Sequence, residues 1–272
     1  MGRQAKKDPH RIDTRKPIDL SKCPTGADDF HDNREAAESE SAELQTRLAG
    51  LQNRLYAQGT QNLLVVLQAM DAGGKDGTIR RVFRGVNPQG VRVTSFKAPT
   101  PEELDHDFLW RIHKAVPGNG MVGVFNRSHY EEVLVVRVHK LVPEKVWRGR
   151  YDQINDFEKL LTDTGTRILK FYLHISKDEQ KERFQDRLKD REKNWKFARE
   201  DLDKRKFWKD YMKAFEELLE KCSPKHAPWY IIPADQKWYR NLAILRVLVA
   251  TLEDMNPTYP PAEEGLESIV VK

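Results

Sequence analysis

The stretch Leu63-Leu-Val-Val-Leu67, followed three residues later by Asp71-Ala-Gly-Gly-Lys-Asp-Gly-Thr78, decides the fold. A short run of consecutive apolar residues is typical of a strand that is buried on both faces of a parallel sheet. The glycine-rich run predicts a tight turn, and a helix is expected from about residue 75 to residue 85. A strand that leads through such a turn into a helix is the repeating unit of an α/β protein.

The rest of the chain repeats this alternation of strand and helix. The repetition predicts a doubly wound, mostly parallel sheet of about five strands that is flanked by helices. The further strands are expected at residues 91–96, 121–125, 168–175 and 229–232. The helices are expected at residues 35–56, 75–85 and 101–116, after the third strand through residue 138, and at residues 146–161 and 238–254.

Composition divides the chain into three regions. Residues 1–34 are polar and lack a sustained period, which predicts an extended or partly ordered arm. Residues 35–261 carry the alternating strands and helices and are expected to form a single domain. Residues 262–272 are left as a C-terminal tail.

A long charged stretch lies between the fourth and fifth expected strands. Residues 177–221 fit two helices that are broken near residues 194–197. Charges of both signs at helical spacing are typical of salt-bridged surface helices. The alternative is a helical lid, at about residues 177–213, that closes over a site.

The charge balance favours an anionic partner. The 272 residues include 47 Lys and Arg against 42 Asp and Glu, which gives a formal charge of +5 and a pI near 9.0. Such a surplus suits nucleic acid or phosphate-rich small molecules. Composition alone does not choose between these two partners.

Several classes of protein are excluded by the sequence. Its apolar runs are too short to span a bilayer, and no apolar segment follows the basic N-terminus as in a secretory signal. Cys23 and Cys222 cannot build a disulfide framework and suit a reducing compartment. We therefore expect a cytoplasmic protein without membrane attachment.

The glycine-rich turn is a candidate phosphate site. Gly73, Gly74 and Gly77 let the backbone aim its N–H groups at an anion, and the start of the helix adds partial positive charge. Lys75 is placed to reach terminal phosphates as a point charge, and Thr78 closes the run. The alternative is that this turn is only a tight connection between strand and helix.

The turn departs from a strict P-loop in two positions. Ala69 stands where the motif has glycine, and Asp76 stands where it has the Ser or Thr that meets magnesium. Asp71 is the carboxylate that could replace this hydroxyl. A carboxylate ~4 Å from a polyanion costs several kcal/mol unless a cation lies between them, which predicts Mg²⁺ at Asp71.

A second motif, Phe125-Asn-Arg-Ser-His-Tyr-Glu-Glu132, ends the third strand. Because ligands of such sheets bind in a crevice at the carboxyl ends of the strands, this motif and the glycine-rich turn are expected to face the same crevice. Arg127 could bind phosphate through two hydrogen bonds, and Glu131 or Glu132 could hold a metal ion. Ser128 and Glu131 have the spacing of a capping box, which leaves Glu132 as the freer carboxylate. The eight histidines show no zinc-binding spacing.

These residues resemble the family-2 polyphosphate kinases. The resemblance covers about residues 35–261 and rests on several motifs in order: residues 71–79, 93–100, 107–113, 125–131 and 194–197, with Trp208 and Tyr211. It implies a P-loop-kinase-like catalytic domain with a helical lid. It also implies the reversible transfer of phosphoryl groups between inorganic polyphosphate and nucleotides, with Mg²⁺.

The resemblance implies roles for particular residues. Asp71 resembles the loop aspartate that organises magnesium and the acceptor phosphate, and Lys75 resembles the loop lysine on the phosphates. Arg127 resembles the arginine of the second motif and Arg183 a lid arginine. Independently of the resemblance, a lid formed by the charged stretch would bring Arg183, and with it Arg187 or Arg191, to the transferring phosphoryl group.

Two positions depart from the family pattern. Many relatives have Asp where Asn126 stands, so a metal role there moves to Glu132, where relatives with the Asn form often have Asp. The Asn form, with Asn126 in the nucleotide-binding part of the site, resembles the subgroup that acts on both AMP and ADP.

A polyphosphate partner explains the basic surplus by counterion release. The expected groove is lined by Lys75, Arg80, Arg81, Lys97, Arg111 and Arg127. Adenine nucleotides, and guanine nucleotides as a further possibility, are the expected second substrate, and a homo-oligomer is expected. The alternatives are an ordinary ATP-dependent kinase, against which the irregular P-loop argues, and a nucleic-acid-binding protein, for which no recognition motif is present.

Overall fold

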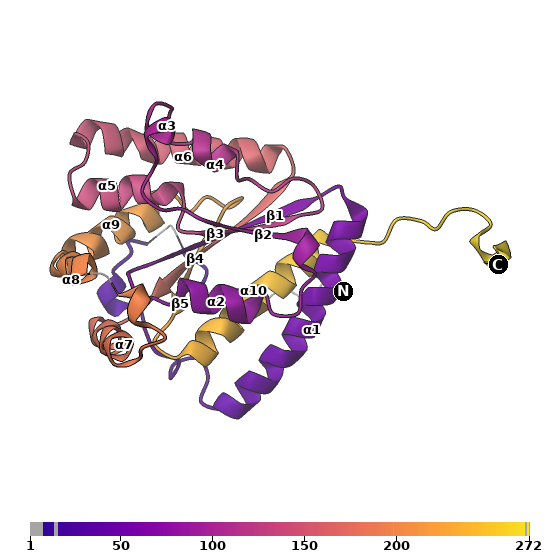
Figure 1. Cartoon of the computed structure of the whole chain (residues 1–272), viewed down its shortest axis with the longest axis horizontal. Coiled ribbons are helices and arrows are strands. Elements are labelled where there is room, and N and C mark those ends of the chain that lie inside the picture. The colour runs from indigo at the N-terminus through magenta and orange to yellow at the C-terminus, as the bar shows by residue number, and fades with distance from the viewer. Residues whose placement is uncertain (1–7, 14–15, 198, 270, 272) are drawn as a thin grey trace.

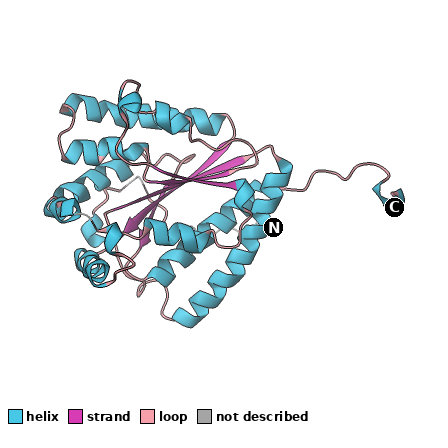
Figure 2. Cartoon of the chain, viewed as in Figure 1, coloured by secondary structure: helices cyan, strands magenta, loops and turns pink. Residues whose placement is uncertain are grey.

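The centre of the structure, a computed structural model that describes residues 8–13, 16–197, 199–269 and 271, is a sheet of five strands (Figures 1 and 2). All neighbouring strands are parallel, in the order β2-β3-β1-β4-β5, which confirms the predicted sheet. The strands are β1 (Asn62–Ala69), β2 (Val91–Ser95), β3 (Val122–Asn126), β4 (Thr166–His174) and β5 (Trp229–Pro233).

Helices cover both faces of the sheet (Figure 1). Side chains of β1 alternate between the faces, so Leu63 and Val65 pack in one apolar cluster while Leu64 and Val66 pack in the other. This alternation explains why every position of this central strand must be apolar. The first face is covered by α1 (Arg34–Gln58), α2 (Lys75–Val82) and α10 (Lys237–Met255), and the second by α4 (Trp110–His113), α6 (Glu144–Asp163) and α9 (Trp208–Lys221).

Two expected helices are shorter than predicted. The helix expected at residues 101–116 is divided into α3 (Pro101–Leu104) and α4, because the Asp107 carboxylate accepts the N–H of Leu109 and competes with the helical pattern. The helix expected after β3 is a 3₁₀ turn, η3 (His129–Val133), followed by the short α5 (Val135–Val138).

The charged stretch forms three helices rather than two. They are α7 (Lys177–Lys189), α8 (Arg199–Lys206) and α9, and they lie beside the carboxyl ends of the strands (Figure 1). The predicted break is present, because the Asn194 amide donates to the carbonyls of Arg187 and Leu188 at the end of α7. A second break falls at Phe207, whose ring packs against His139 with 5.2 Å between centroids.

Described residues of the N-terminal arm pack on the body of the protein. The N–H of Ile12 donates to the carbonyl of Trp229, and the N–H of Ile231 donates to the carbonyl of His10, so the arm covers the outer edge of β5. Residues 1–7 and 14–15 of the predicted arm, and residues 270 and 272 of the predicted tail, lie outside the described residues.

The chain leaves the body after α10 as an extended segment (Figure 1). None of the helices in the described part of the chain combines the length and the apolar character that a membrane crossing requires.

Candidate active site

The glycine turn, residues 71–78, connects the end of β1 to α2 and has a left-handed backbone at two positions. Ala72 has φ +60° and Gly74 φ +95°, and the N–H of Gly73 donates to the carbonyl of Met70 over 2.9 Å. A side chain at Gly73 would place its Cβ 2.4 Å from the Cβ of Ala69. The tight turn predicted from the sequence therefore depends on glycine at this position.

Lys75 is buried at the centre of the turn. Its side chain folds back so that Nζ donates to the carbonyl of Ala69 over 3.1 Å. Burial, with a contribution from Arg127, lowers the pKa of Lys75 to about 8, although Asp71 opposes the shift. A buried ammonium at this point gives the turn a concentrated positive charge.

Asp71 lies between two cations from different parts of the chain. Its Oδ1 accepts from Arg127 Nη2 at 2.8 Å, and its Oδ2 lies 3.3 Å from Lys204 Nζ of α8. Burial alone would raise the pKa of Asp71, but Arg127, Lys75 and Lys204 outweigh it and lower the pKa. The lowered pKa keeps Asp71 ionised at neutral pH, so its carboxylate is available to a cation.

Lys204 was not singled out in the sequence. It is one of many charged residues in the stretch 177–221, and no spacing distinguishes it from its neighbours. Only the fold of α8 over the glycine turn brings it to Asp71.

The second motif meets the glycine turn, as predicted. Asn126 donates through Nδ2 to Asp76 Oδ1 at 2.8 Å, and Arg127, which has φ +63°, reaches Asp71. Ser128 caps η3 by accepting the N–H of Tyr130. The two motifs converge because parallel strands β1 and β3 end at the same edge of the sheet.

The structure exchanges the roles that were predicted for the two glutamates of this motif. Glu131 makes no capping box: its Oε1 lies 3.0 Å from the side-chain amide of Gln68, which donates to it when the amide is turned over, and with Asp71 it lines a cavity of about 30 Å³. Glu132 does not line that cavity and forms an ion pair with Arg150, while burial raises its pKa. The sequence argument that left Glu132 as the freer carboxylate is thus corrected, because η3 is a 3₁₀ turn and not the start of an α-helix.

A metal ion would find a limited set of ligands here. No cluster of three or more His, Cys, Asp or Glu side chains with metal-binding geometry occurs within the described ranges. Mg²⁺ commonly takes one or two carboxylates together with phosphate oxygens, and Asp71 and Glu131 on one small cavity fit that donor set.

Arg183 is placed differently from the prediction that it touches the transferring phosphoryl group. Its Nη1 donates to the carbonyl of Ala72 at 3.0 Å, and its Nη2 donates to the carbonyl of Ala234 at 2.6 Å. Its Nε forms an ion pair with Glu179 at 2.7 Å. In this structure Arg183 therefore connects the glycine turn to the end of β5.

The other two lid candidates lie further along the stretch. Arg187 packs over the ring of Phe184, and Arg191 is exposed.

A basic cleft of about 870 Å³ continues from the turn along α2 and α10. It carries the predicted Arg80 and Arg81, and it touches Gly77. Its charged lining consists of Arg34, Arg80, Arg81, Arg84, Lys237 and Arg240 against Glu38, Glu179 and Asp235.

Two residues of the predicted groove lie elsewhere. Arg111 donates to the carbonyl of Lys97 at 3.0 Å and pairs with Glu103 at 3.2 Å, so these two basic residues form a separate group near the end of β2. Thr78, the last residue of the predicted phosphate-binding turn, is fully buried in α2, and its Oγ1 has no hydrogen-bond partner among the described residues.

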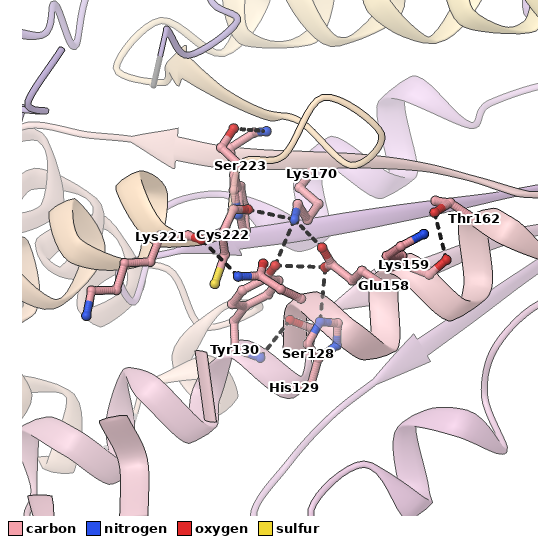
Figure 3. A network of polar contacts seen from close by, with 12 residues as sticks. Ser128, His129, Tyr130, Glu158, Lys159, Thr162, Lys170, Lys221, Cys222 and Ser223 are labelled. Carbon is pink, nitrogen blue, oxygen red and sulfur yellow. Dashed lines mark hydrogen bonds and ion pairs between the residues drawn. The ribbon is translucent and has the colours of Figure 1, made fainter. Parts of the chain in front are cut away.

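A buried polar network holds the second motif from behind (Figure 3). Lys170 of β4 forms an ion pair with Glu158 of α6 and also donates to the hydroxyl of Tyr130 and the carbonyl of Cys222, both at 2.8 Å. Tyr130 and His129 in turn hydrogen-bond to Glu158 Oε1, at 2.7 Å and 3.2 Å. We refer to Lys170, Glu158, Tyr130 and His129 as the core network.

The core network determines the protonation state of His129. Burial lowers the pKa of His129, so its ring is neutral at pH 7, and Nε2 carries the proton because Glu158 can only accept. Because His129 and Tyr130 belong to η3 and both hydrogen-bond to Glu158, the network anchors η3, which begins two residues after Arg127.

Comparison with known proteins assigns the family. The family model described as "Polyphosphate kinase 2 (PPK2)" matches residues 31–260. The chain is 54% identical over 243 residues to an AMP/ADP-polyphosphate phosphotransferase of Meiothermus ruber, covering 89% of this chain and 91% of that protein. It is 45% identical over 262 residues to an ADP-polyphosphate phosphotransferase of Rhodopseudomonas palustris, covering 92% and 91%.

A solved structure agrees with this assignment. The crystal structure of polyphosphate kinase 2 from Arthrobacter aurescens TC1 superposes with a TM-score of 0.91 at 42% sequence identity, over 95% of this chain and 93% of that chain. The matches span nearly the whole sequence, including the glycine turn and the second motif. The chain belongs to the polyphosphate kinase 2 family.

Proposed function

We propose that this protein transfers phosphoryl groups between inorganic polyphosphate and AMP or ADP, reversibly and with Mg²⁺. The observation that carries the proposal is that the basic cleft reaches Gly77 of the glycine turn, the turn that also carries Lys75 and meets Arg127. A polymer with about one negative charge per phosphate gains from such a cleft by releasing its counterions. The names of the relatives support the same pair of substrates.

The chain's own residues act by position and charge. Lys75 and Arg127 neutralise the terminal phosphates, while the N–H groups at the start of α2 point toward the same anion. An oxygen of the nucleotide's terminal phosphate attacks the terminal phosphorus of the polymer, the P–O–P bond breaks, and the shortened polymer leaves. No general base is required, because the attacking phosphate oxygen is already deprotonated.

Asp71 and Glu131 would hold Mg²⁺, which when bound reduces the repulsion between donor and acceptor phosphates. The helices of the charged stretch would exclude water, since Lys204 of α8 already reaches Asp71 across the site. Asn126 lies at the same edge of the sheet and is the candidate contact on the nucleotide side.

Further features of the protein belong to the same proposal. Adenine nucleotides, and guanine nucleotides as alternative acceptors, are the expected substrates, and the enzyme is expected to assemble as a homo-oligomer. Cys23 and Cys222 are free thiols, which suits a cytoplasmic location.

The test is ATP formation from ADP, long-chain polyphosphate and Mg²⁺, measured with luciferase beside reactions with AMP and without polymer. Polymer-dependent ATP that is lost in Asp71→Asn and retained in Lys159→Ala is expected, since Lys159 pairs with Asp163 on the surface of α6. A folded protein that makes no polymer-dependent ATP would redirect the assignment to an ATP-dependent kinase.

A further inference from the structure

Arg240 is a buried arginine without a carboxylate partner. It lies in the second turn of α10 with 3% of its surface exposed. Its Nε and Nη2 both donate to the neutral amide oxygen of Asn241, at 3.2 Å and 3.0 Å. No ion pair joins Arg240 to a carboxylate in the described part of the chain.

The surroundings of Arg240 add to its positive charge. Burial, followed by the nearby Arg183, lowers its pKa to about 9, and Glu179 only partly opposes this shift. Glu179 is itself engaged by Arg183 Nε at 2.7 Å. Two guanidinium groups therefore share one carboxylate, which is costly in a buried site unless an anion completes the balance.

Arg246 on the same helix, in contrast, has a carboxylate partner. Its Nε and Nη2 donate to the two carboxylate oxygens of Glu40, both at 2.6 Å. Arg246 does not line the basic cleft, whereas Arg240 does. The unbalanced arginine is thus the one that faces the cleft.

The guanidinium of Arg240 lies directly against the glycine turn. A Cβ added at Gly74 would be 2.1 Å from Arg240 Nη1, and one added at Gly77 would be 3.8 Å from Nη2. Arg240 therefore stands beside Gly74 and Gly77 of the turn, in the lining of the basic cleft that also carries the exposed Arg80 and Arg81.

We propose that Arg240 is a specificity-determining residue for the phosphoryl donor, which binds the internal phosphates of polyphosphate where the chain passes from the glycine turn into the basic cleft. The proposal rests on the proposed function. The planar guanidinium can bind phosphate oxygens through parallel hydrogen bonds, and the anion supplies the charge balance that the folded protein lacks. A donor with no negative charge at this point leaves Arg240 buried and unbalanced, so such a donor is disfavoured.

The experiment compares Arg240→Gln and Arg240→Lys with the control Arg246→Gln in the full chain. Arg240→Gln is expected to raise the KM for polyphosphate at least tenfold while the KM for ADP stays within twofold. Arg240→Lys, which keeps the charge but not the planar fork, is expected to fall between Arg240→Gln and wild type. Arg246→Gln is expected to leave both KM values unchanged.

Thermal unfolding separates this role from a structural one. Without ligand, Arg240→Gln is expected to unfold at the same temperature as wild type or higher, because the substitution removes an unbalanced buried charge. The stabilisation that polyphosphate gives to wild type is expected to shrink in this variant. If Arg240→Gln does not fold, Arg240→Lys carries the same comparison of KM values.

Calorimetry with polyphosphate alone distinguishes the two proposals. A wild-type enzyme that binds the polymer but transfers nothing would overturn the proposed function. Transfer by wild type with an unchanged KM for polyphosphate in the folded Arg240 variants would overturn the role of Arg240. An equal rise of both KM values would also overturn it, because that result indicates a general distortion of the site.

Discussion

Two groups of buried charges lie in this molecule, and they differ in their balance. In the core network Lys170 faces Glu158, and the three hydrogen-bond donors of its ammonium all have partners. At the glycine turn Lys75, Arg127 and Lys204 face the carboxylates of Asp71, Glu131 and Asp76, but the adjoining basic cleft is lined by six basic residues against three acidic ones. The Lys170–Glu158 pair is balanced within the protein, whereas the glycine turn and the basic cleft together carry a surplus of cations that an anion would balance.

The difference indicates what each group does. A balanced buried pair specifies local structure, and here it holds η3 in place behind Arg127. A surplus of cations is mutually repulsive in the unliganded protein, and a bound anion compensates it. Stability and activity should therefore respond in opposite ways in the two groups.

The largest effect is expected from breaking the balanced group. Lys170→Met leaves Glu158 buried and unpaired, which should lower the free energy of unfolding by about 3–5 kcal/mol. Urea denaturation measures this loss, and Lys170→Met combined with Glu158→Gln should recover a large part of it. A loss below about 1 kcal/mol in the single variant would show that the Lys170–Glu158 ion pair contributes no more to stability than a pair on the surface.

Substitution in the unbalanced group should act on rate and not on stability. Lys75→Ala removes a preorganised charge from the transferring phosphates, so kcat should fall about 10²–10³-fold. The free energy of unfolding should be unchanged or higher, because burial disfavours the charged form of Lys75 more than its neighbouring carboxylates stabilise it. Steady-state kinetics and urea denaturation on the same samples test both statements, and a large loss of stability would contradict the comparison.

The pH dependence of the wild type sharpens the same contrast. The pKa of Lys75 is lowered from 10.5 to about 8, so above pH 8 the folded protein loses the proton that binds phosphate. The kcat/KM for polyphosphate should then fall, approaching about tenfold per pH unit. Over the same range the unfolded chain binds more protons than the folded one, so this lysine makes stability rise with pH between about 8 and 10.5. A kcat/KM profile that is flat from pH 7 to about pH 9.5 would contradict the assignment of Lys75.

The smallest effect is expected at Lys204, a partly exposed member of the unbalanced group. Its ion pair with Asp71 Oδ2 occupies an oxygen that a cation would need. Lys204→Ala should lower the Mg²⁺ concentration for half-maximal rate by about twofold to fivefold, the size expected of a partly exposed ion pair. Lys206→Ala on the same helix, where Lys206 pairs with Asp203, is the control and should leave the Mg²⁺ dependence unchanged.

The fold could be predicted largely from the sequence because its signals are local. The apolar run of β1 and the glycine turn together specify a buried strand that leads into a helix. The meeting of the turn with Arg127 follows from parallel topology, since β1 and β3 end at one edge. These conclusions needed no side-chain geometry.

The rest depended on which way side chains point. A 3₁₀ turn in place of an α-helix directs Glu131 to Asp71 and Glu132 to Arg150. Lys204 is hidden among many similar charges. Arg240 has no spacing in the sequence that marks it as a site residue, and only the packing of α10 on the glycine turn brings it beside Gly74 and Gly77.

The pairing of the N-terminal arm with β5 has a consequence for how the protein is made. Hydrogen bonds between residues 10–12 and residues 229–231 join segments more than 200 positions apart. Contacts of such long sequence separation form slowly, because a long loop must close first. During synthesis residues 10–12 are made well before β5, so the outer edge of β5 is covered only after β5 itself has left the ribosome.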